Sequence, residues 1–270
     1  MAIHKLGGTY NFRDTGGLPL ADGGTTACGV LYRSDAISSL TPTGLADLAG
    51  SGIRVIIDYR TPAEQKMAPD RLPAAMEVEK VDLPLLEGAF TGMAGEAMQR
   101  AAASGDPAAA GKAMEAALER LPTLGQLYIG MLEHGAANFA RTAGEVAAGE
   151  GAVLIHCTAG KDRTGVAAAL LLDAAGADRD AVVADYERSG QDLAGEWSDR
   201  MLGMVGSMGV PLTEQIVTLI TRAPAEAIQS ALGWVEETYG SAAAYLRAGG
   251  LTDTELTRLR ARLRQPRAQA

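Results

Sequence analysis

The 270-residue sequence has few cysteines and a shortage of basic charge. Its two cysteines, Cys28 and Cys157, cannot build the disulfide framework that marks small secreted domains. Lysine and arginine number 24 against 33 acidic residues, so the formal net charge is −9. Nucleic acid and anionic membranes are therefore not expected as main partners, because both require a positive surface.

Long apolar runs are also missing. The longest, residues 166–172, is far shorter than the roughly 20 residues that a membrane-spanning helix requires. The first ten residues contain no apolar stretch of the kind found in signal peptides. We therefore expect a cytoplasmic protein in a reducing compartment, with export without a leader left open. The 47% apolar content is ample for one core, and we predict a single domain over residues 1–270.

Strand and helix patterns alternate along the chain. Residues 53–58 (IRVIID) and 152–155 lack polar alternation, which is typical of strands covered on both faces. This alternation predicts an α/β fold with a mainly parallel central sheet flanked by helices and a helical C-terminal third. Further strands are predicted at residues 30–32 and 78–83, helices after the Thr-Pro pairs 41–42 and 61–62, and helices at 124–148, 164–175, 180–189, 212–222, 224–239 and 252–264. Residues 87–119, rich in alanine, glycine and methionine, are interpreted as a variable helical insertion.

The segment HCTAGKDRTG, residues 156–165, is the strongest functional signal. Cys157 directly follows a buried strand pattern and Arg163 directly precedes an apolar helix, so the intervening backbone must turn at a helix N-terminus. Backbone amides and the positive end of the helix favour phosphate and thiolate at such a turn. Cys157 is therefore predicted to be a nucleophilic thiolate, and Arg163 to hold two phosphate oxygens with its planar guanidinium.

The rest of the loop supplies the predicted support and substrate contacts. His156 is expected to pin the loop through ring hydrogen bonds, and Thr164 either donates to the thiolate or only starts the helix. Lys161 is either a second phosphate contact or a solvent-exposed lysine. Because thiolate, amides and arginine supply charge stabilisation together, we expect no metal and no cofactor. The predicted substrate-binding residues are Thr158, Ala159, Gly160, Lys161, Asp162 and Arg163.

This decapeptide resembles the signature loop of the protein tyrosine phosphatase superfamily, and more narrowly the loop of a bacterial tyrosine phosphatase family with mycobacterial and Listeria members, which has Lys-Asp before the arginine. The resemblance implies a phosphocysteine intermediate, action on phosphotyrosine, and a possible extension to phosphoserine, phosphothreonine and phosphoinositides. It also implies a mobile helical lid. Similar segments occur in the same order at residues 11–14 (NFRD), 31–35 (LYRSD), 58–60 (DYR), 185–189, 239–241 and 245–246.

The candidate lid is residues 190–222, which contain Trp197, Met201, Met204 and Met208, although methionines at such spacing also suit an ordinary core. Arg13 and Asp14 are expected to support the loop from behind, with a simple turn-locking ion pair as the alternative.

The general acid is left open, because the Trp-Pro-Asp tripeptide of many tyrosine phosphatases is absent. Asp58 is favoured since it ends a buried strand, where sites of α/β proteins form; a pair with Arg60 is the alternative. Asp162 is expected chiefly to order the loop, with the acid role second, and Asp82 ranks behind both. A phosphoinositide phosphatase, a phosphate-binding module and a thiol redox protein are the competing functions.

Overall fold

The computed structural model describes residues 3–85 and 121–265, so the predicted insertion at 87–119 lies outside the described residues. The strands there are β1 (Arg13–Asp14), β2 (Thr25–Thr26), β3 (Leu31–Ser34), β4 (Ile53–Asp58), β5 (Glu79–Asp82), β6 (Ala152–His156) and β7 (Arg264–Gln265). The helices are α1 (Pro42–Gly50), α2 (Pro62–Met67), α5 (Leu124–Ala148), α6 (Asp162–Ala175), α7 (Arg179–Asp192), α8 (Glu196–Ser207), α9 (Glu214–Thr221), α10 (Ala225–Tyr239), α11 (Ala242–Ala248) and α12 (Asp253–Leu263).

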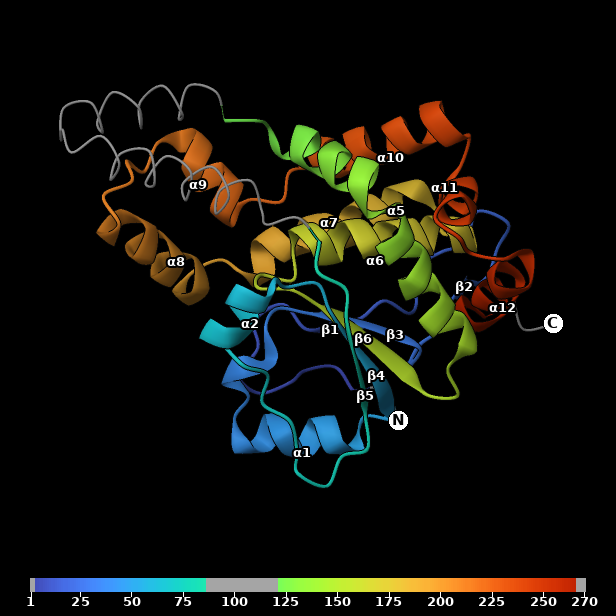
Figure 1. The fold of residues 1–270 in the computed structure, drawn as a ribbon, viewed down its shortest axis with the longest axis horizontal. Coiled ribbons are helices and arrows are strands. Elements are labelled where there is room, and N and C mark those ends of the chain that lie inside the picture. The colour runs from blue at the N-terminus through green and yellow to red at the C-terminus, as the bar shows by residue number, and fades with distance from the viewer. Residues whose placement is uncertain (1–2, 86–120, 266–270) are drawn as a thin grey trace.

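The central sheet has five strands in the order β1-β3-β6-β4-β5 (Figure 1). β3, β6, β4 and β5 run parallel to their neighbours, and the two-residue β1 pairs antiparallel with β3. A separate two-stranded pairing joins β2 to β7. The predicted α/β fold with a mainly parallel sheet and a helical C-terminal third is confirmed.

Both faces of this sheet are buried, which explains the unbroken apolar runs in its central strands. Ile57 and Ile155 pack in the core shared with α5 and α6, whereas Ile56 and Leu154 pack in the core shared with α1. Figure 1 shows α1 on one side of the sheet and α5 and α6 on the other. All four side chains are fully buried, and each such burial stabilises the fold by about 1.5–3 kcal/mol.

Local sequence signals define several helix ends, and α1 begins after Thr41 as predicted. The Thr41 hydroxyl accepts from the Gly44 amide and Pro42 occupies the first turn of α1. The capping box of Thr252 and Glu255 opens α12, and Gly176 ends α6 in the left-handed conformation. Among the residues that the structure describes, no helix combines the length and apolarity needed to cross a membrane.

Three parallel strands end at the same edge of the sheet. Ser34 of β3 and Asp58 of β4 are both in register with His156 of β6. The residues that follow these strand ends are thereby brought together, and this edge carries the candidate site.

Candidate active site

The loop between β6 and α6 holds the cysteine and the arginine of the motif. β6 ends at His156 and α6 begins at Asp162, so residues 157–161 join a buried strand to a helix N-terminus, as predicted. Cys157 is 1% exposed. Gly160 has φ +65°, and a Cβ at this position would lie 2.4 Å from the carbonyl oxygen of Ser34. Glycine is therefore required where the loop passes the end of β3.

Three carbonyl groups of the loop are bound from behind. The Ala36 amide donates to the Thr158 oxygen (3.1 Å), Asn11 Nδ2 donates to the Ala159 oxygen (2.9 Å), and Arg33 Nη2 donates to the Gly160 oxygen (2.8 Å). In a trans peptide unit the carbonyl and the following N–H point in opposite directions. The amides that follow these three carbonyls therefore point away from the supporting side, which makes the loop an anion cradle.

The Arg163 guanidinium forms an ion pair with the carboxylate of Glu64, a contact that was not predicted from the sequence. Its Nη1 and Nη2 donate to Glu64 Oε2 (2.7 Å) and Oε1 (2.6 Å), a bidentate pair between residues 99 positions apart. Nη1 also donates to the Tyr59 carbonyl oxygen (3.3 Å), and the Thr158 hydroxyl donates to Glu64 Oε1 (2.6 Å). Glu64 thus fixes the plane of the guanidinium beside the loop.

Glu64 also caps the helix in which it lies. Its Oε2 accepts from the Thr61 amide (2.9 Å) at the start of α2. Burial opposes its ionisation, but the Arg163 guanidinium and the other donors lower the pKa of Glu64 to about 2. Because this folded-state pKa lies below the ordinary value, the pair stabilises the fold above pH about 4.5 and loses that contribution as the pH falls toward 2.

A buried ion cluster behind the loop contains Arg13. Asp185 Oδ1 accepts from Arg13 Nε (2.7 Å), and its Oδ2 accepts from Arg33 Nη1 (2.6 Å). Both arginines also donate to the Ser189 hydroxyl. Burial raises the pKa of Asp185, but Arg33 and Arg13 outweigh it and hold that pKa below its usual range. Arg33 connects this cluster to the loop, because its Nη2 donates to the Gly160 carbonyl oxygen.

Asp14 lies apart from this support. Its carboxylate accepts from the Gly16 amide (2.8 Å) and the Gly29 amide (2.7 Å), so it orders two turns of the N-terminal segment. Arg13 pairs with Asp185 rather than with Asp14, so the alternative of a local turn-locking pair is not seen. Asp14 makes no hydrogen bond to residues 157–163 in the part of the chain described here.

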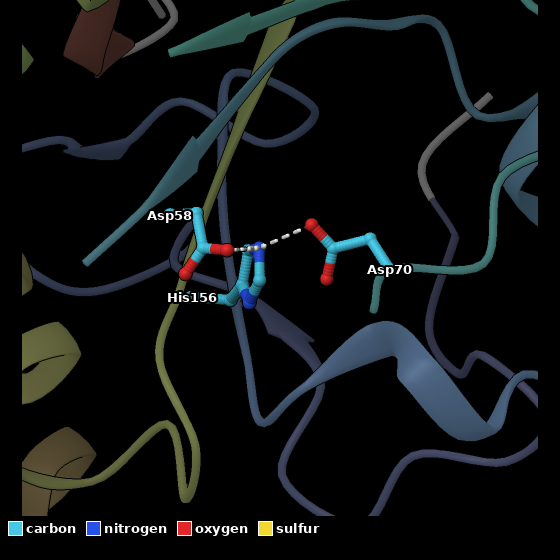
Figure 2. Close-up of side chains that lie close together, drawn as sticks. All are labelled: Asp58, Asp70 and His156. Atoms are coloured by element: carbon cyan, nitrogen blue, oxygen red, sulfur yellow. Dashed lines mark ion pairs between the residues drawn. The ribbon is translucent and has the colours of Figure 1, made fainter. Parts of the chain in front are cut away.

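His156 lies between two carboxylates rather than in hydrogen bonds with the loop. Its Nε2 is 3.9 Å from Asp58 Oδ2 and 3.7 Å from Asp70 Oδ2, and Figure 2 shows the ring between these side chains. The ring is fully buried, and within residues 3–85 and 121–265 neither ring nitrogen has a hydrogen-bond partner. Burial lowers the pKa of His156, so the ring is neutral at neutral pH.

This histidine and the two aspartates have the donor types of a metal site, but their charges are already balanced. Arg60 Nη2 binds Asp58 Oδ2 (2.8 Å) and Asp70 Oδ1 (2.5 Å), and Lys80 Nζ lies 2.9 Å from Asp70 Oδ2. A divalent ion would have to enter beside two buried or half-buried cations. We therefore interpret the cluster as an internal salt-bridge network.

The same contacts bear on the acid role predicted for Asp58. Its carboxylate is fully buried and accepts from the Arg60 amide and guanidinium (2.8–3.1 Å). Burial raises the pKa of Asp58, but the Arg60 hydrogen bonds outweigh it and lower that pKa below the ordinary value. A carboxylate held in this way retains no proton at neutral pH. The geometry therefore favours the alternative that the sequence left open, a pair with Arg60.

Asp162 was predicted to order the loop, and Lys161 to contact phosphate or to be exposed to solvent. The contacts of both side chains in the structure differ from these predictions. The Asp162 side chain is 28% exposed and its Oδ1 accepts from the Tyr128 hydroxyl (2.6 Å). The Lys161 side chain is 1% exposed, and its Nζ donates to the carbonyls of Leu219 (2.7 Å) and Ile220 (3.2 Å). Lys161 thus binds the C-terminal end of α9 in this structure.

The helices of the candidate lid contact the loop directly. Trp197 of α8 is 4% exposed and shares an apolar cluster with Ala159, with Met201 packed against it. Met204 and Met208 are 41% and 50% exposed, so they are surface residues. Thr164 is fully buried, and its hydroxyl has no partner among the described residues. The hydrogen bond to the Cys157 sulfur that the first of its two predicted roles requires is therefore not seen in this structure.

A buried cysteine, an anion cradle and a clamped arginine at a strand-to-helix turn define the class of cysteine-dependent phosphatases. Residues 4–265 match the family model described as the tyrosine phosphatase family, and the chain belongs to that family. It is 32% identical over 288 residues to the triple specificity protein phosphatase PtpB of Mycobacterium tuberculosis, with 96% of this chain and 98% of that protein covered.

Solved structures of P. aeruginosa TpbA give weaker matches. The chain is 16% identical to TpbA, with 70% of this chain and 86% of that chain covered and a TM-score of 0.33. A TpbA complex with phosphotyrosine is also 16% identical, with 65% and 86% covered and a TM-score of 0.32. Scores this low add nothing to the argument about fold.

Proposed function

We propose that this phosphatase hydrolyses phosphotyrosine, and also phosphoserine and phosphothreonine, through a phosphocysteine at Cys157. The observation that carries the proposal is the orientation of the loop. With the carbonyls of Thr158, Ala159 and Gly160 bound from behind, the following amides face the side where a phosphate would sit. The triple specificity named for the mycobacterial relative supports a substrate range wider than phosphotyrosine.

The proposed reaction has two steps. In the first, Cys157 Sγ forms a bond to phosphorus while the bond from phosphorus to the leaving oxygen breaks, and Asp162 gives that oxygen a proton. In the second, water attacks phosphorus, Asp162 takes a proton from the water, and the sulfur–phosphorus bond breaks to release inorganic phosphate and the thiolate. Arg163 and the loop amides neutralise the charge on the phosphate oxygens in both steps.

Phosphate release from a phosphotyrosine peptide in the presence of EDTA tests this mechanism. We expect activity to be unchanged by the chelator and to be inhibited by vanadate, an anion that fits the cradle. Peroxide should inactivate the enzyme, and inorganic phosphate should slow that inactivation because it shields the thiolate. Loss of activity with EDTA, restored by zinc or magnesium, would instead indicate a metal-dependent hydrolase.

Asp162 is our proposed general acid because of its surroundings. It lies at the first position of α6 beside the cradle, and its side chain is partly exposed. The Asp58 carboxylate is already paired with Arg60. Asp82, at the end of β5, accepts from Gln65 Nε2 (3.0 Å), and its side chain is 53% exposed. This reverses the order in which sequence reasoning ranked Asp58 and Asp162.

We expect Asp162→Asn to slow poor leaving groups selectively. Its kcat for a phosphotyrosine peptide should fall by about 10²- to 10³-fold, whereas kcat for an aryl phosphate with a highly acidic phenol should fall less than about 10-fold, because that leaving group departs without a proton. Steady-state kinetics on the two substrates check this. An equal fall in kcat for both substrates would show that Asp162 only orders the loop.

Asp58→Asn is the comparison variant. Removing this carboxylate leaves Arg60 without its main buried partner, so we expect a loss of about 3 kcal/mol in the free energy of unfolding. The folded fraction should show no leaving-group dependence in its kinetics. Urea denaturation combined with active-site titration by vanadate separates these two effects.

Three finer statements belong to the same proposal. Residues 190–222 form a lid that opens for substrate, because α8 and α9 contact the loop through Trp197 and through Lys161. The domain spans residues 1–270, and its compartment is the reducing cytoplasm, which keeps Cys157 unoxidised. Phosphoinositides are the less favoured substrates, since the ammonium group of Lys161 that would read a second phosphate is bound to α9 carbonyls.

A further inference from the structure

The general acid has a buried tyrosine as its neighbour. Tyr128 of α5 is fully buried, and its hydroxyl donates to Asp162 Oδ1 over 2.6 Å. The Tyr128 oxygen also lies 2.8 Å from the Tyr186 hydroxyl of α7, and the two rings meet edge to face with centroids 6.0 Å apart. Side chains from α7 and α5 thus form a chain that ends on the Asp162 carboxyl group of α6, whose Oδ1 also lies 3.5 Å from Lys161 Nζ.

The directions of these hydrogen bonds follow from the number of protons. A tyrosine hydroxyl has one proton, and an ionised carboxylate can only accept. Because Tyr128 donates to Asp162, the Tyr186 hydroxyl must donate to the Tyr128 oxygen. Burial and the Asp162 charge hold the pKa of Tyr128 well above its usual value, so its proton remains on the phenol. The chain of donors therefore runs from Tyr186 through Tyr128 to Asp162.

We propose that Tyr128 is a positioning residue that holds the Asp162 carboxyl and places its transferable proton on Oδ2. This inference rests on the proposed acid role of Asp162. With Oδ1 accepting from Tyr128, a protonated Asp162 must carry its hydrogen on Oδ2, for which no donor is found among the described residues. The Oδ2 proton is then the one available to a leaving oxygen in the cradle.

Replacing one hydroxyl tests the proposal with little change in packing. We expect Tyr128→Phe to lower kcat for a phosphotyrosine peptide by about 10- to 100-fold, the size expected from one charge-assisted hydrogen bond. The kcat for an aryl phosphate with a highly acidic phenol should stay within about 3-fold, as should KM and the affinity for vanadate. A role in fold or loop order alone would lower both substrates together.

Two comparison variants sharpen the result. Tyr245 is another fully buried tyrosine, whose hydroxyl donates to the Leu132 carbonyl (2.8 Å), and Tyr245→Phe makes the same chemical change on a different contact. It should leave the kcat for both substrates unchanged. Tyr186→Phe removes the second donor of the chain and should give a smaller, leaving-group-dependent loss than Tyr128→Phe.

The double variant of Tyr128→Phe with Asp162→Asn separates this inference from the proposed function. If Tyr128 acts through Asp162, the double variant should be no slower on phosphotyrosine than Asp162→Asn alone, within about 3-fold. Multiplying losses, or an unaltered Tyr128→Phe enzyme beside a defective Asp162→Asn enzyme, would overturn the positioning role and leave the acid in place. Absence of leaving-group dependence in Asp162→Asn itself would overturn both assignments.

Discussion

Cys157→Ser is expected to lower kcat for a phosphotyrosine peptide by roughly 10⁴-fold or more, because a serine hydroxyl is a far weaker nucleophile than a cysteine sulfur. The cradle and Arg163 stay in place, so binding of the peptide should be within about 3-fold of the unmodified enzyme. Phosphate release and isothermal titration calorimetry measure the two quantities. We therefore expect a variant that binds the peptide but does not hydrolyse it.

Cys28→Ser is the matched control for this change. Cys28 is exposed and lies outside the loop, so its replacement should leave both kcat and peptide binding unchanged. Activity of Cys157→Ser above about 1% of the unmodified enzyme would reject a covalent mechanism. Peptide binding lost together with turnover would show instead that the thiol side chain holds the loop in shape.

Arg163→Lys is expected to lower kcat/KM by about 10³-fold although it conserves the charge. The guanidinium uses both terminal nitrogens on Glu64 and a second Nη1 hydrogen on the Tyr59 carbonyl. Its planar fork can keep these contacts while the Nε–H and the second Nη2 hydrogen bind phosphate. A lysine ammonium is a single point that cannot satisfy Glu64 and two phosphate oxygens in one geometry. Steady-state kinetics and vanadate inhibition should both show the loss.

A distant arginine provides the control for Arg163→Lys. Arg262 of α12 donates from its two terminal nitrogens to the carbonyls of Val146 (2.6 Å) and Gly151 (2.5 Å), so it is also held as a fork. Arg262→Lys should reduce thermal stability without a change in kcat/KM. Near-normal catalysis by Arg163→Lys would remove the clamp role and leave the cradle amides to bind phosphate alone.

Much of the fold follows from local patterns in the sequence. The strand predicted at residues 53–58 is β4, Ile53–Asp58, and the helix predicted at 124–148 is α5, Leu124–Ala148. Capping residues such as Thr41 and Thr252 act over three or four positions, so their effect can be predicted without a tertiary structure. The strand–loop–helix placement of Cys157 and Arg163 is of the same local kind.

The general acid and the carboxylate that holds Arg163 could not be predicted in this way. Asp58 had the position expected of a site residue at a strand end, but its burial beside Arg60 depends on the fold around it. Glu64 displayed a capping pattern, and nothing in its neighbours along the chain pointed to an arginine 99 residues away. Lys161 likewise pairs with carbonyls of α9, which no periodicity predicts.

The sequence by itself therefore determined the placement of Cys157 and Arg163, the loop that joins them and the order of strands and helices along the chain. Those features depend on hydrophobic period and on backbone preferences within a few residues, which composition and spacing report directly. Only the tertiary structure decided which polar side chains meet: Arg163 with Glu64, Asp58 with Arg60, and Asp162 with Tyr128. The strand order β3-β6-β4 and the packing of α5 against α6 bring these partners together. The protonation state of each polar side chain depends on how deeply it is buried and on which charges lie beside it, and both are set by this packing.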